Sequence, residues 1–566
     1  MSPGRRSRDG AIAMKLIERR SGLLFAAFAL AFLIVFVRAA WLQAVKGGEL
    51  SADARSQQVA TVTVPGIRGA ILDRSGSALA VSEEAATIFA TPYQVVDPPK
   101  AARKLAAVLD VPEDELLASL TAQSGFEYLA KKVDLVTAKK VEKLDLDGIG
   151  ELPDSRRVYP QNEDGARMIG VIGDEGQGLF GIEANEDDAL RGTDGEVSIT
   201  KDALGQEIGR DVVTGAEAGH DVQLTIDGRI QAYTEKVLRD VGDAYDPEGA
   251  TAVVMNPQSG DVLAMASWPP IDPTDLSTAT AEQTVNMPTG YTYEPGSTFK
   301  AFTVAGALED GTVKPNQQFE VGPSIKVADR TIEEAHEGLG YRTLTTADIL
   351  AQSSNVGAVT IGLELGAKRF SEWVDKFGFG RPTGIQYSPD EQGIVPSYDD
   401  YSGSSIGNLP IGQGLSVTPM QMMEGYAAIA NGGILRPPRL IESVDGEPVE
   451  EPEGSRVISE NTSAELRKML EGVLGPFGTA PEVEVPGYVL AGKTGTAQKV
   501  IDGTYSDTQY VASFVGFAPA EDPKLLVSVI VDDPKGGDYY GGTVAAPAFG
   551  EIASFALPYL GIAPTS

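Results

Sequence analysis

The sequence predicts an α+β multidomain protein, with an N-terminal transmembrane helix, a mixed α/β pedestal domain and a larger C-terminal domain. Three observations lead to this fold class: the length of 566 residues, one long apolar run near the N-terminus, and a change of pattern near residue 219. A chain of this length exceeds what one hydrophobic core supports, so several domains are expected. We place a basic tail at residues 1–21, the anchor at 22–45, the pedestal at 46–218 and the C-terminal domain at 219–566.

The apolar run predicts a helix that crosses a membrane once. Residues 22–37 carry no charge, and Arg38 and Trp41 then suit the boundary between lipid and water. With residues 38–45 the run approaches the ~20 residues that a spanning helix needs. Because basic residues precede it, we expect a cytoplasmic N-terminus and an exported body. A cleaved signal peptide is the alternative, although its apolar core is normally about 7–15 residues long.

The pedestal region mixes strand and helix patterns. Residues 46–58 are polar and suit a stalk, and residues 59–80 alternate as short strands around turns. Residues 99–145 are predicted to be helical, with Pro112 at the first position of a helix. Residues 157–226 return to short strands and glycine turns. No compact cluster of catalytic residue types occurs in this region of the sequence.

The C-terminal domain carries strand patterns at both of its ends. Residues 249–267 hold two apolar strands around the turn at 256–260, which predicts a hairpin. Residues 488–499, 509–518 and 525–532 also read as strands, and 545–555 as a helix. The middle of the domain is mostly helical in pattern. We therefore expect one antiparallel sheet assembled from both ends and flanked by helices, with an all-helical lobe beside it.

Composition excludes several classes of function. The formal net charge is −34: residues 1–20 hold six basic and two acidic residues and so carry +4, which leaves −38 for the rest. Such an acidic body repels phosphate backbones, so no nucleic-acid partner is expected. The absence of cysteine removes disulfides, thiolate catalysis and cysteine metal sites. The two histidines, His220 and His336, suit loop or surface positions better than a catalytic triad, and no metal or cofactor is expected.

Ser297 and Lys300 form the first of three short motifs. Glu294, Pro295 and Gly296 interrupt the chain before Ser297, and apolar residues at helical spacing follow it. Ser297 is therefore expected in the first turn of a helix, with Lys300 one turn further on the same side. A neutral Lys300 could accept the serine proton, provided that burial or a nearby positive charge lowers its pKa. A serine with a lysine three residues on is expected about once by chance in such a chain, so a solvated surface lysine is the alternative.

The second motif, Ser353-Ser354-Asn355, lies between two runs of helical pattern. A loop between helices can present both Ser353 and Asn355 to a cleft. Ser353 could relay a proton between the lysine and a leaving amine, and Asn355 could hold a substrate amide. Capping of the following helix is the alternative, because serine and asparagine are favoured there as well.

The third motif, Lys493-Thr494-Gly495-Thr496, opens a predicted strand. Lys493 would supply a positive charge for a carboxylate, and the missing side chain of Gly495 would let a substrate approach the backbone. The backbone N–H groups of Thr496 and Ser297 could form an oxyanion hole. The alternative is an edge strand protected by its lysine.

The order and spacing of the three motifs resemble those of the penicillin-binding proteins and the serine β-lactamases. Ser353 follows Ser297 by 56 residues and Lys493 follows it by 196. With its anchor and pedestal, the whole chain resembles the class B penicillin-binding proteins, whose C-terminal domain is a D,D-transpeptidase. Further matches lie at residues 68–76, 181–183, 190–192, 225–227, 412–414, 417–419, 541–543 and 545–547.

The resemblance implies an acyl-transfer reaction without a cofactor or metal. The serine attacks the D-alanyl-D-alanine end of a peptidoglycan stem peptide, and an amine from a neighbouring stem then attacks the acyl-enzyme to form a cross-link. β-Lactam antibiotics mimic the donor. The implied catalytic residues are Ser297, Lys300, Ser353 and Asn355; the substrate-binding residues are Lys493, Thr494, Gly495 and Thr496; and the backbone oxyanion hole is formed by Ser297 and Thr496.

Residues 294–300 and 352–357 look more like the division-specific, septal subgroup than the elongation subgroup. This resemblance implies a single-pass protein of the bacterial cell membrane with an extracytoplasmic catalytic domain. It also implies a polytopic peptidoglycan glycosyltransferase and other divisome proteins as partners. The alternatives are an elongation-type transpeptidase, a serine β-lactamase and a catalytically silent wall-binding scaffold. A β-lactamase would not normally need the anchor or the pedestal.

Overall fold

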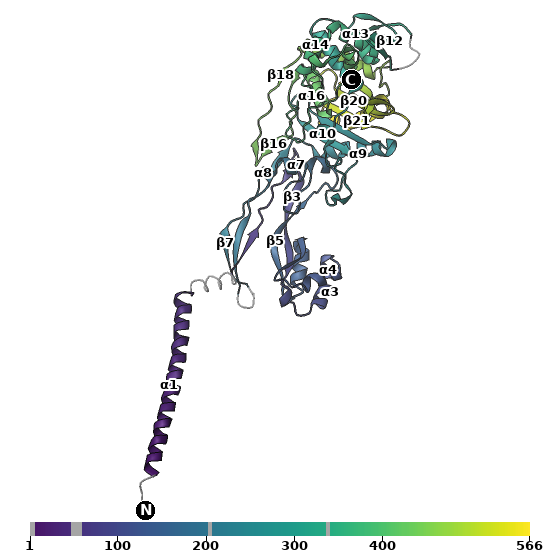
Figure 1. The fold of residues 1–566 in the computed structure, drawn as a ribbon. Coiled ribbons are helices and arrows are strands. Elements are labelled where there is room, and N and C mark those ends of the chain that lie inside the picture. The colour runs from purple at the N-terminus through teal and green to yellow at the C-terminus, as the bar shows by residue number, and fades with distance from the viewer. Residues whose placement is uncertain (1–5, 47–58, 202–206, 336–339, 566) are drawn as a thin grey trace, which may run out of the picture. The chain divides into compact units, whose positions relative to one another are not determined.

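The computed structural model describes residues 6–46, 59–201, 207–335 and 340–565 (Figure 1). His336 and nearly all of the predicted stalk lie outside these residues. The chain divides into two compact units, one made of Met1–Pro65 with Asp194–Glu217 and the other of Gly66–Thr193 with Ala218–Ser566. Each unit is described by itself.

The first unit contains the predicted membrane-spanning helix. Helix α1 (Arg6–Ala44) includes the segment Glu18–Ala44, whose mean hydropathy is 2.5. Within the described residues it is the one helix that is long and apolar enough to cross a membrane, as expected for a single-pass anchor. The unit also holds a three-stranded antiparallel sheet in the order β1-β6-β7 (Val59–Val64, Gly195–Lys201 and Glu207–Thr214).

The second unit begins with the pedestal sheet. Strand β3 (Ala78–Ala90) pairs antiparallel with β2 (Ile71–Leu72), β4 (Glu127–Asp134) and β5 (Ile149–Val158). Strand β2 pairs in parallel with β8 (Val222–Leu224). On its other edge β8 pairs antiparallel with β16 (Ile441–Val444), which pairs with β17 (Glu447–Pro448). Segments of the C-terminal half of the chain therefore extend the pedestal sheet.

Helix throughout residues 99–145 was a wrong prediction. Helices α3 (Pro98–Leu109), α4 (Glu113–Leu120) and α5 (Leu135–Glu142) are present, but β4 occupies Glu127–Asp134 between them. Pairing with β3 overrides the local helical pattern, because Leu129 thereby enters a small core made with the three helices. Pro112 caps α4 instead of opening it. Three short helices also interrupt the predicted strands of 157–226, namely α6 (Ala166–Ile169), α7 (Gly181–Asn185) and α8 (Asp187–Leu190).

A buried ion cluster joins two of the sequence matches within the pedestal. The Arg68 guanidinium lies 2.6 Å from both Glu183 and Asp187, and Arg157 lies 2.7 Å from Glu183. Each charge in the cluster faces an opposite charge, as burial of ions requires. The matches at residues 68–76 and 181–183 therefore meet in space.

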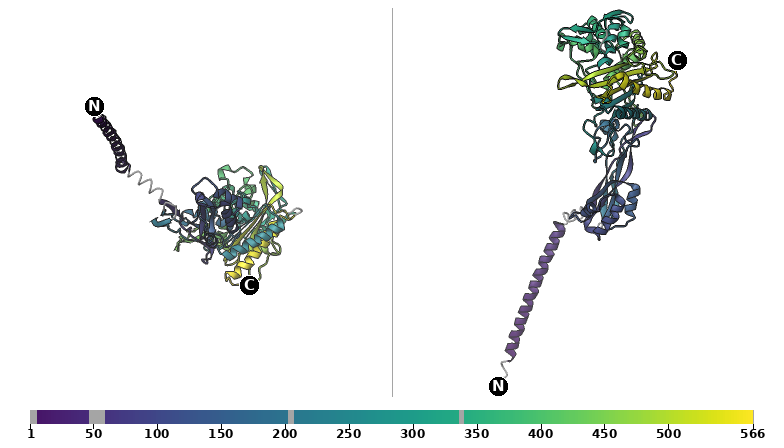
Figure 2. Two further views of the ribbon diagram at one scale, coloured as in Figure 1. Left: turned by 90° about the horizontal axis from the view of Figure 1, so that it is seen from below. Right: turned by 90° about the vertical axis from the view of Figure 1, so that its right-hand side faces the viewer.

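The predicted sheet from both ends of the C-terminal domain is confirmed. It is antiparallel in the order β10-β9-β21-β20-β19, and its strands are Val262–Trp268, Gly249–Met255, Leu525–Asp532, Thr504–Ala518 and Ala491–Ile501. Helices α9 (Gly228–Tyr245) and α19 (Ala546–Tyr559) lie side by side against it, teal and yellow in Figure 2. Their Tyr233 and Phe555 rings stack with centroids 4.1 Å apart. On the other side of the sheet lies α16 (Pro419–Ala430).

The helical lobe carries the middle of the domain. Its helices are α11 (Lys300–Glu309), α12 (Thr346–Ala351), α13 (Asn355–Leu365), α14 (Ala367–Lys376) and α17 (Glu460–Glu471). Two two-stranded antiparallel sheets accompany them, which the sequence did not indicate: β11 (Gln318–Val321) with β14 (Arg342–Thr345), and β12 (Ser324–Val327) with β13 (Arg330–Glu333). The lobe is therefore mostly helical, not all-helical as expected. Shorter elements complete the second unit: η1 (Pro92–Gln94), η2 (Leu276–Thr278), α10 (Met287–Gly290), η3 (Gly296–Phe299), η4 (Tyr398–Asp400), α15 (Ser405–Asn408), η5 (Leu409–Ile411), β15 (Ile434–Leu435), β18 (Ser455–Arg456), η6 (Gly472–Leu474) and α18 (Gly541–Val544). The predicted fold class is confirmed.

Candidate active site

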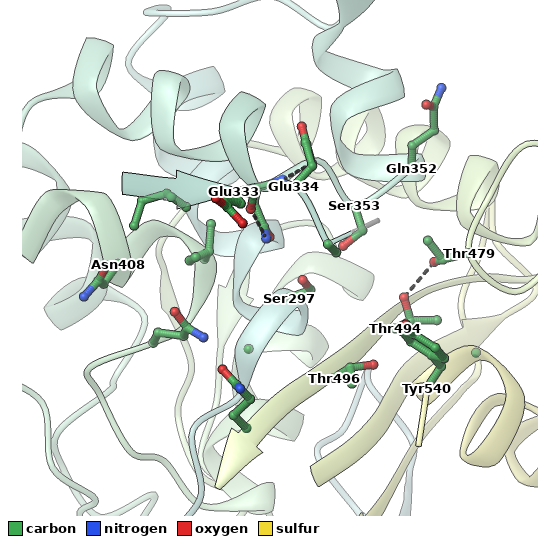
Figure 3. Close-up of a pocket in the computed structure, with 18 of the residues that line it drawn as sticks. Ser297, Glu333, Glu334, Gln352, Ser353, Asn408, Thr479, Thr494, Thr496 and Tyr540 are labelled. Atoms are coloured by element: carbon green, nitrogen blue, oxygen red, sulfur yellow. Dashed lines mark hydrogen bonds between the residues drawn. The ribbon is translucent and has the colours of Figure 1, made fainter. Parts of the chain in front are cut away.

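A cleft of about 820 Å³ lies between the helical lobe and strand β19, and it brings the three motifs together. Figure 3 shows Ser297 near its centre, with Ser353 above it and Thr494 and Thr496 to its right and below. Asn355 lines the cleft as well. The remaining predicted residues are buried next to these: Lys300, Lys493 and Gly495. Segments nearly two hundred residues apart in sequence thus form one site.

Ser297 is held in the tight turn η3, which leads directly into α11. Gly296 has a positive φ of 54°, and its N–H donates to the Gly412 carbonyl at 3.0 Å. A Cβ on Gly412 would lie 2.1 Å from the Gly296 carbonyl oxygen, so only glycine permits this approach. The Tyr426 hydroxyl donates to the Thr298 carbonyl at 2.7 Å. The turn is fixed on both sides, and Ser297 remains partly exposed to the cleft.

The Lys300 amine is fully buried and turned toward the second motif. Its Nζ donates to the Ser353 carbonyl and to Asn355 Oδ1, both at 2.6 Å, and lies 3.3 Å from Ser353 Oγ. Burial lowers the pKa of Lys300 from 10.5 to about 7, against the opposing effect of the Glu334 carboxylate. A substantial fraction of Lys300 is therefore neutral near pH 7, as a proton acceptor must be.

In the second motif one residue caps a helix and the two residues beside it contact Lys300. Ser354 caps α13, because its Oγ accepts from the Gly357 N–H at 3.0 Å. Ser353 and Asn355 instead face Lys300, so capping does not account for them. Ser353 has a positive φ of 59°, an uncommon conformation for a residue with a side chain. The bend at Ser353 directs its carbonyl to the lysine.

Glu334 is a site residue that the sequence did not reveal. Its two carboxylate oxygens accept from Ser354 Oγ at 2.5 Å and from the Asn355 N–H at 3.0 Å. The Arg342 guanidinium lies 3.5 Å from the same carboxylate. Asn355 Nδ2 also donates to the Glu333 carbonyl at 3.0 Å. An acid pair at the end of a small hairpin has no distinctive sequence pattern, so only the fold shows this contact.

Lys493 is buried in β19 and contributes a second amine. Its Nζ donates to the Thr494 carbonyl at 3.1 Å. Burial and the neighbouring Lys300 hold the pKa of Lys493 well below its usual value. Two buried amines, one from the lobe and one from the sheet, therefore lie close enough to influence each other.

Strand β19 is an edge strand of the five-stranded sheet, and its threonines are oriented by side-chain bonds. Thr494 and Thr479 share a hydroxyl–hydroxyl contact at 2.6 Å. The Thr496 hydroxyl accepts from the Gly541 N–H at 3.1 Å. An edge strand leaves alternate N–H groups unpaired by the sheet, and this property suits a strand that lines a substrate cleft.

The expected role of Gly495 needs correction. A Cβ on Gly495 would lie 2.3 Å from Ser513 Oγ and 3.0 Å from both the Pro295 carbonyl oxygen and Thr298 Cγ2. The space beside this glycine is filled by protein, so the missing side chain does not make room for a substrate. It lets the turn that carries Ser297 lie directly against β19.

Sequence reasoning also missed most of the remaining cleft lining. Tyr540 belongs to a stack of three tyrosine rings, in which the Tyr510–Tyr539 centroids are 4.1 Å apart and the Tyr539–Tyr540 centroids 4.6 Å. Tyr510 lies in β20, whereas Tyr539 and Tyr540 precede α18, and no local pattern indicates that these segments meet. The other lining residues are Arg330, Thr331, Ile332, Glu333, Ala335, Arg342, Gln352, Asn408, Ile411, Gln413, Phe477, Gly478, Thr479, Gln498, Tyr505, Gly542 and Thr543.

Two protein-family models match the chain. The penicillin-binding protein transpeptidase domain matches residues 250–554, and the penicillin-binding protein dimerisation domain matches residues 63–224. Stage V sporulation protein D of Bacillus subtilis is 37% identical over 548 residues, which cover 94% of this chain and 84% of that protein. Peptidoglycan D,D-transpeptidase FtsI of Escherichia coli is 35% identical over 558 residues, covering 97% and 93%.

Solved structures show the same similarity. Penicillin-binding protein 3 of Mycobacterium tuberculosis in complex with aztreonam has a TM-score of 0.71 and 30% identity, covering 89% of this chain and 98% of that one. The ampicillin complex of the same protein has a TM-score of 0.71 and 30% identity, covering 89% and 97%. Penicillin-binding protein 2X of Streptococcus thermophilus has a TM-score of 0.76 at 25% identity, covering 88% and 80%.

Proposed function

The chain belongs to the class B penicillin-binding proteins of the division type, and we propose that Ser297 is the nucleophile with which it cross-links peptidoglycan stem peptides. The protein is a serine-type D,D-transpeptidase that acts in septal cell-wall synthesis. Its substrate is the stem peptide. β-Lactams mimic the donor stem and acylate the protein. The observation that carries our assignment of residues is the buried Lys300 amine, one helical turn from Ser297 and held by the second motif.

Acylation of Ser297 uses Lys300 as the general base. The neutral amine takes the hydroxyl proton as Ser297 Oγ attacks the carbonyl of the D-alanyl-D-alanine bond. The backbone N–H groups of Ser297 and Thr496 stabilise the oxyanion. Ser353, whose Oγ lies 3.3 Å from the lysine Nζ, passes the proton to the departing D-alanine. An amine from a second stem then attacks the acyl-enzyme carbonyl and forms the amide bond as the ester bond to Ser297 breaks. The amine proton passes through Ser353 and Lys300 to Ser297 Oγ, which restores the free serine.

The strand side of the cleft binds the donor. Thr494 and Thr496 present hydroxyls to the terminal carboxylate, and Lys493 supplies charge beneath them. A carboxylate that arrives beside Lys493 raises the pKa of the amine, because an opposite charge favours the protonated form. Asn355 holds the substrate amide from the lobe side. Gly495 contributes through packing, by keeping Ser297 close to the strand.

We also propose the domain boundaries and the membrane topology of the chain. Residues 1–21 form a cytoplasmic tail, 22–45 the anchor, 46–218 the pedestal and 219–566 the extracytoplasmic transpeptidase domain. The basic residues before the apolar run support this orientation. A polytopic peptidoglycan glycosyltransferase and other divisome proteins are the proposed partners, as the family membership suggests.

Labelling with a fluorescent penicillin tests the assignment. Full-length protein in detergent micelles should acquire a stable label, and Ser297→Ala should acquire none while keeping the wild-type thermal melt. A variant that still labels at the wild-type rate would show that Ser297 is not the nucleophile. A label that forms and disappears within seconds would indicate a β-lactamase, and no label on wild type would favour the silent scaffold.

A further inference from the structure

The Glu334 carboxylate binds two consecutive residues of the second motif, Ser354 and Asn355. One oxygen accepts from Ser354 Oγ and the other from the Asn355 backbone N–H. The residues on either side of Ser354 are the ones that bind Lys300, through the Ser353 carbonyl and Asn355 Oδ1. The Glu334 side chain is almost completely buried, so these bonds are made in a poorly hydrated setting.

From this geometry we propose that Glu334 is a positioning residue that places the second motif on Lys300 and sets the proton affinity of the lysine by its charge. The inference rests on the proposed role of Lys300 as general base. Glu334 touches neither the substrate nor the reacting atoms. It acts through Ser354 and Asn355, and through space on the Lys300 amine.

Three charged groups near Lys300 bear on its protonation. Lys493 faces it from β19, Glu334 from the end of the β12–β13 hairpin, and Arg342 from β14 through its contact with Glu334. Burial favours the neutral form of Lys300, whereas Glu334 favours the protonated form. A protonated Lys300 in turn disfavours a proton on Lys493. Arg342 offsets part of the Glu334 charge. Without Glu334 the amine would lose its proton more readily, and without Arg342 it would hold the proton more tightly.

Two variants with opposite expected signs follow from this balance. Glu334→Gln removes the charge but keeps an oxygen for the Asn355 N–H and a group that reaches Ser354. Arg342→Gln leaves Glu334 uncompensated. When the second-order rate constant for penicillin acylation is measured against pH, its rise reports the pKa of the base in the free enzyme. The midpoint should move down by about one pH unit in Glu334→Gln and up in Arg342→Gln, since a nearby opposite charge shifts a pKa by about 1–3 units.

Glu333→Gln is the matched control. It removes an equal charge from the adjacent residue, whose contact with the motif is made by its main-chain carbonyl. Its midpoint should stay close to the wild-type value. Glu334→Asp, which keeps the charge but shortens the reach, should keep the midpoint and lower the plateau of the rate.

The measurements use full-length protein in detergent, with a thermal melt for every variant. An unchanged midpoint in Glu334→Gln would overturn the proposal, even with a lower plateau, because a purely structural contact would alter the plateau alone. Should Glu334→Gln not fold, Arg342→Gln decides: an upward shift supports the proposal and an unchanged midpoint overturns it. Failure of the proposed function would give a different result, because the wild type itself would then show no labelling that depends on Ser297.

Discussion

Replacing Lys300 by methionine should remove a pH-dependent term from the stability of the helical lobe. In the folded protein burial lowers the pKa of this lysine from 10.5 to about 7. Between these two pH values the unfolded chain holds a proton that the folded chain lacks, so the free energy of unfolding rises with pH. Below pH 7 both states hold the proton, so the free energy of unfolding no longer changes with pH through this group. In the unfolded chain, where the pKa is 10.5, neutralising the lysine at pH 7 costs about 5 kcal/mol, because one pKa unit corresponds to about 1.4 kcal/mol.

The magnitude for the variant follows from one proton. Between pH 7.5 and 9.5 the wild-type free energy of unfolding should rise by about 3 kcal/mol relative to that of Lys300→Met. Lys493 acts in the same direction, because removing Lys300 relieves the repulsion that lowers its pKa. Comparing each variant with the wild type cancels the buried acids, such as Glu235 and Glu424, whose pKa values burial raises to about 8.

Urea unfolding of the full-length protein in detergent, followed by tryptophan fluorescence, measures this difference. Trp373 is a suitable probe because it is buried in the lobe and packs on α11 at Gly306. Lys326→Met, which replaces an exposed lysine of the same lobe, is the control and should show no such slope. A difference between Lys300→Met and wild type that stays constant from pH 7.5 to 9.5 would refute the reasoning, since Lys300 would then keep its proton in the folded protein.

Two further predictions concern packing and the anchor. Gly495→Ala should destabilise the domain by about 1–3 kcal/mol and slow acylation, because its Cβ would lie 2.3 Å from Ser513 Oγ on β20 and 3.0 Å from the Pro295 carbonyl oxygen beside Ser297. Gly125→Ala, whose Cβ would lie an ordinary 3.8 Å from the Tyr93 ring, is the control, and a wild-type urea midpoint in Gly495→Ala would contradict this account. Protein extracted from membranes should retain the apolar run on N-terminal sequencing, whereas a sequence beginning near Ala40 would mean that a signal peptide is cleaved.

The sequence predicted the parts of the molecule whose pattern is local. Apolar strands on both sides of the turn at 256–260 specify the β9–β10 hairpin, and the three motifs specify the chemistry. The sheet built from both ends of the C-terminal domain was also predictable. Apolar strand patterns were recognised only at these two ends, and such strands must bury their apolar faces together. In contrast, β4 could not be read locally, since its pairing with β3 decides its conformation.

Contacts that depend on the fold could not be predicted in the same way. Gly495 looks like an opening for a ligand in a linear strand, but the turn of Ser297 packs into that space. Glu334 lies 19 residues before Ser353 in the sequence, and only the β12–β13 hairpin returns it to the second motif. In both cases the decisive neighbour comes from another element, and no periodicity or motif encodes that distance.

The positions of the two lysines couple the protonation of the general base to the binding of a substrate carboxylate. Lys300 enters from the lobe and Lys493 from the sheet, and folding places both amines in a poorly hydrated wall. Burial disfavours a proton on both amines, and a protonated Lys300 disfavours one on Lys493 as well, so the free protein holds a largely uncharged pair. On the proposed function, a substrate carboxylate beside Thr494 and Thr496 draws a proton onto Lys493. The restored charge lowers the proton affinity of Lys300 further, so donor binding itself favours the form of the base that activates Ser297.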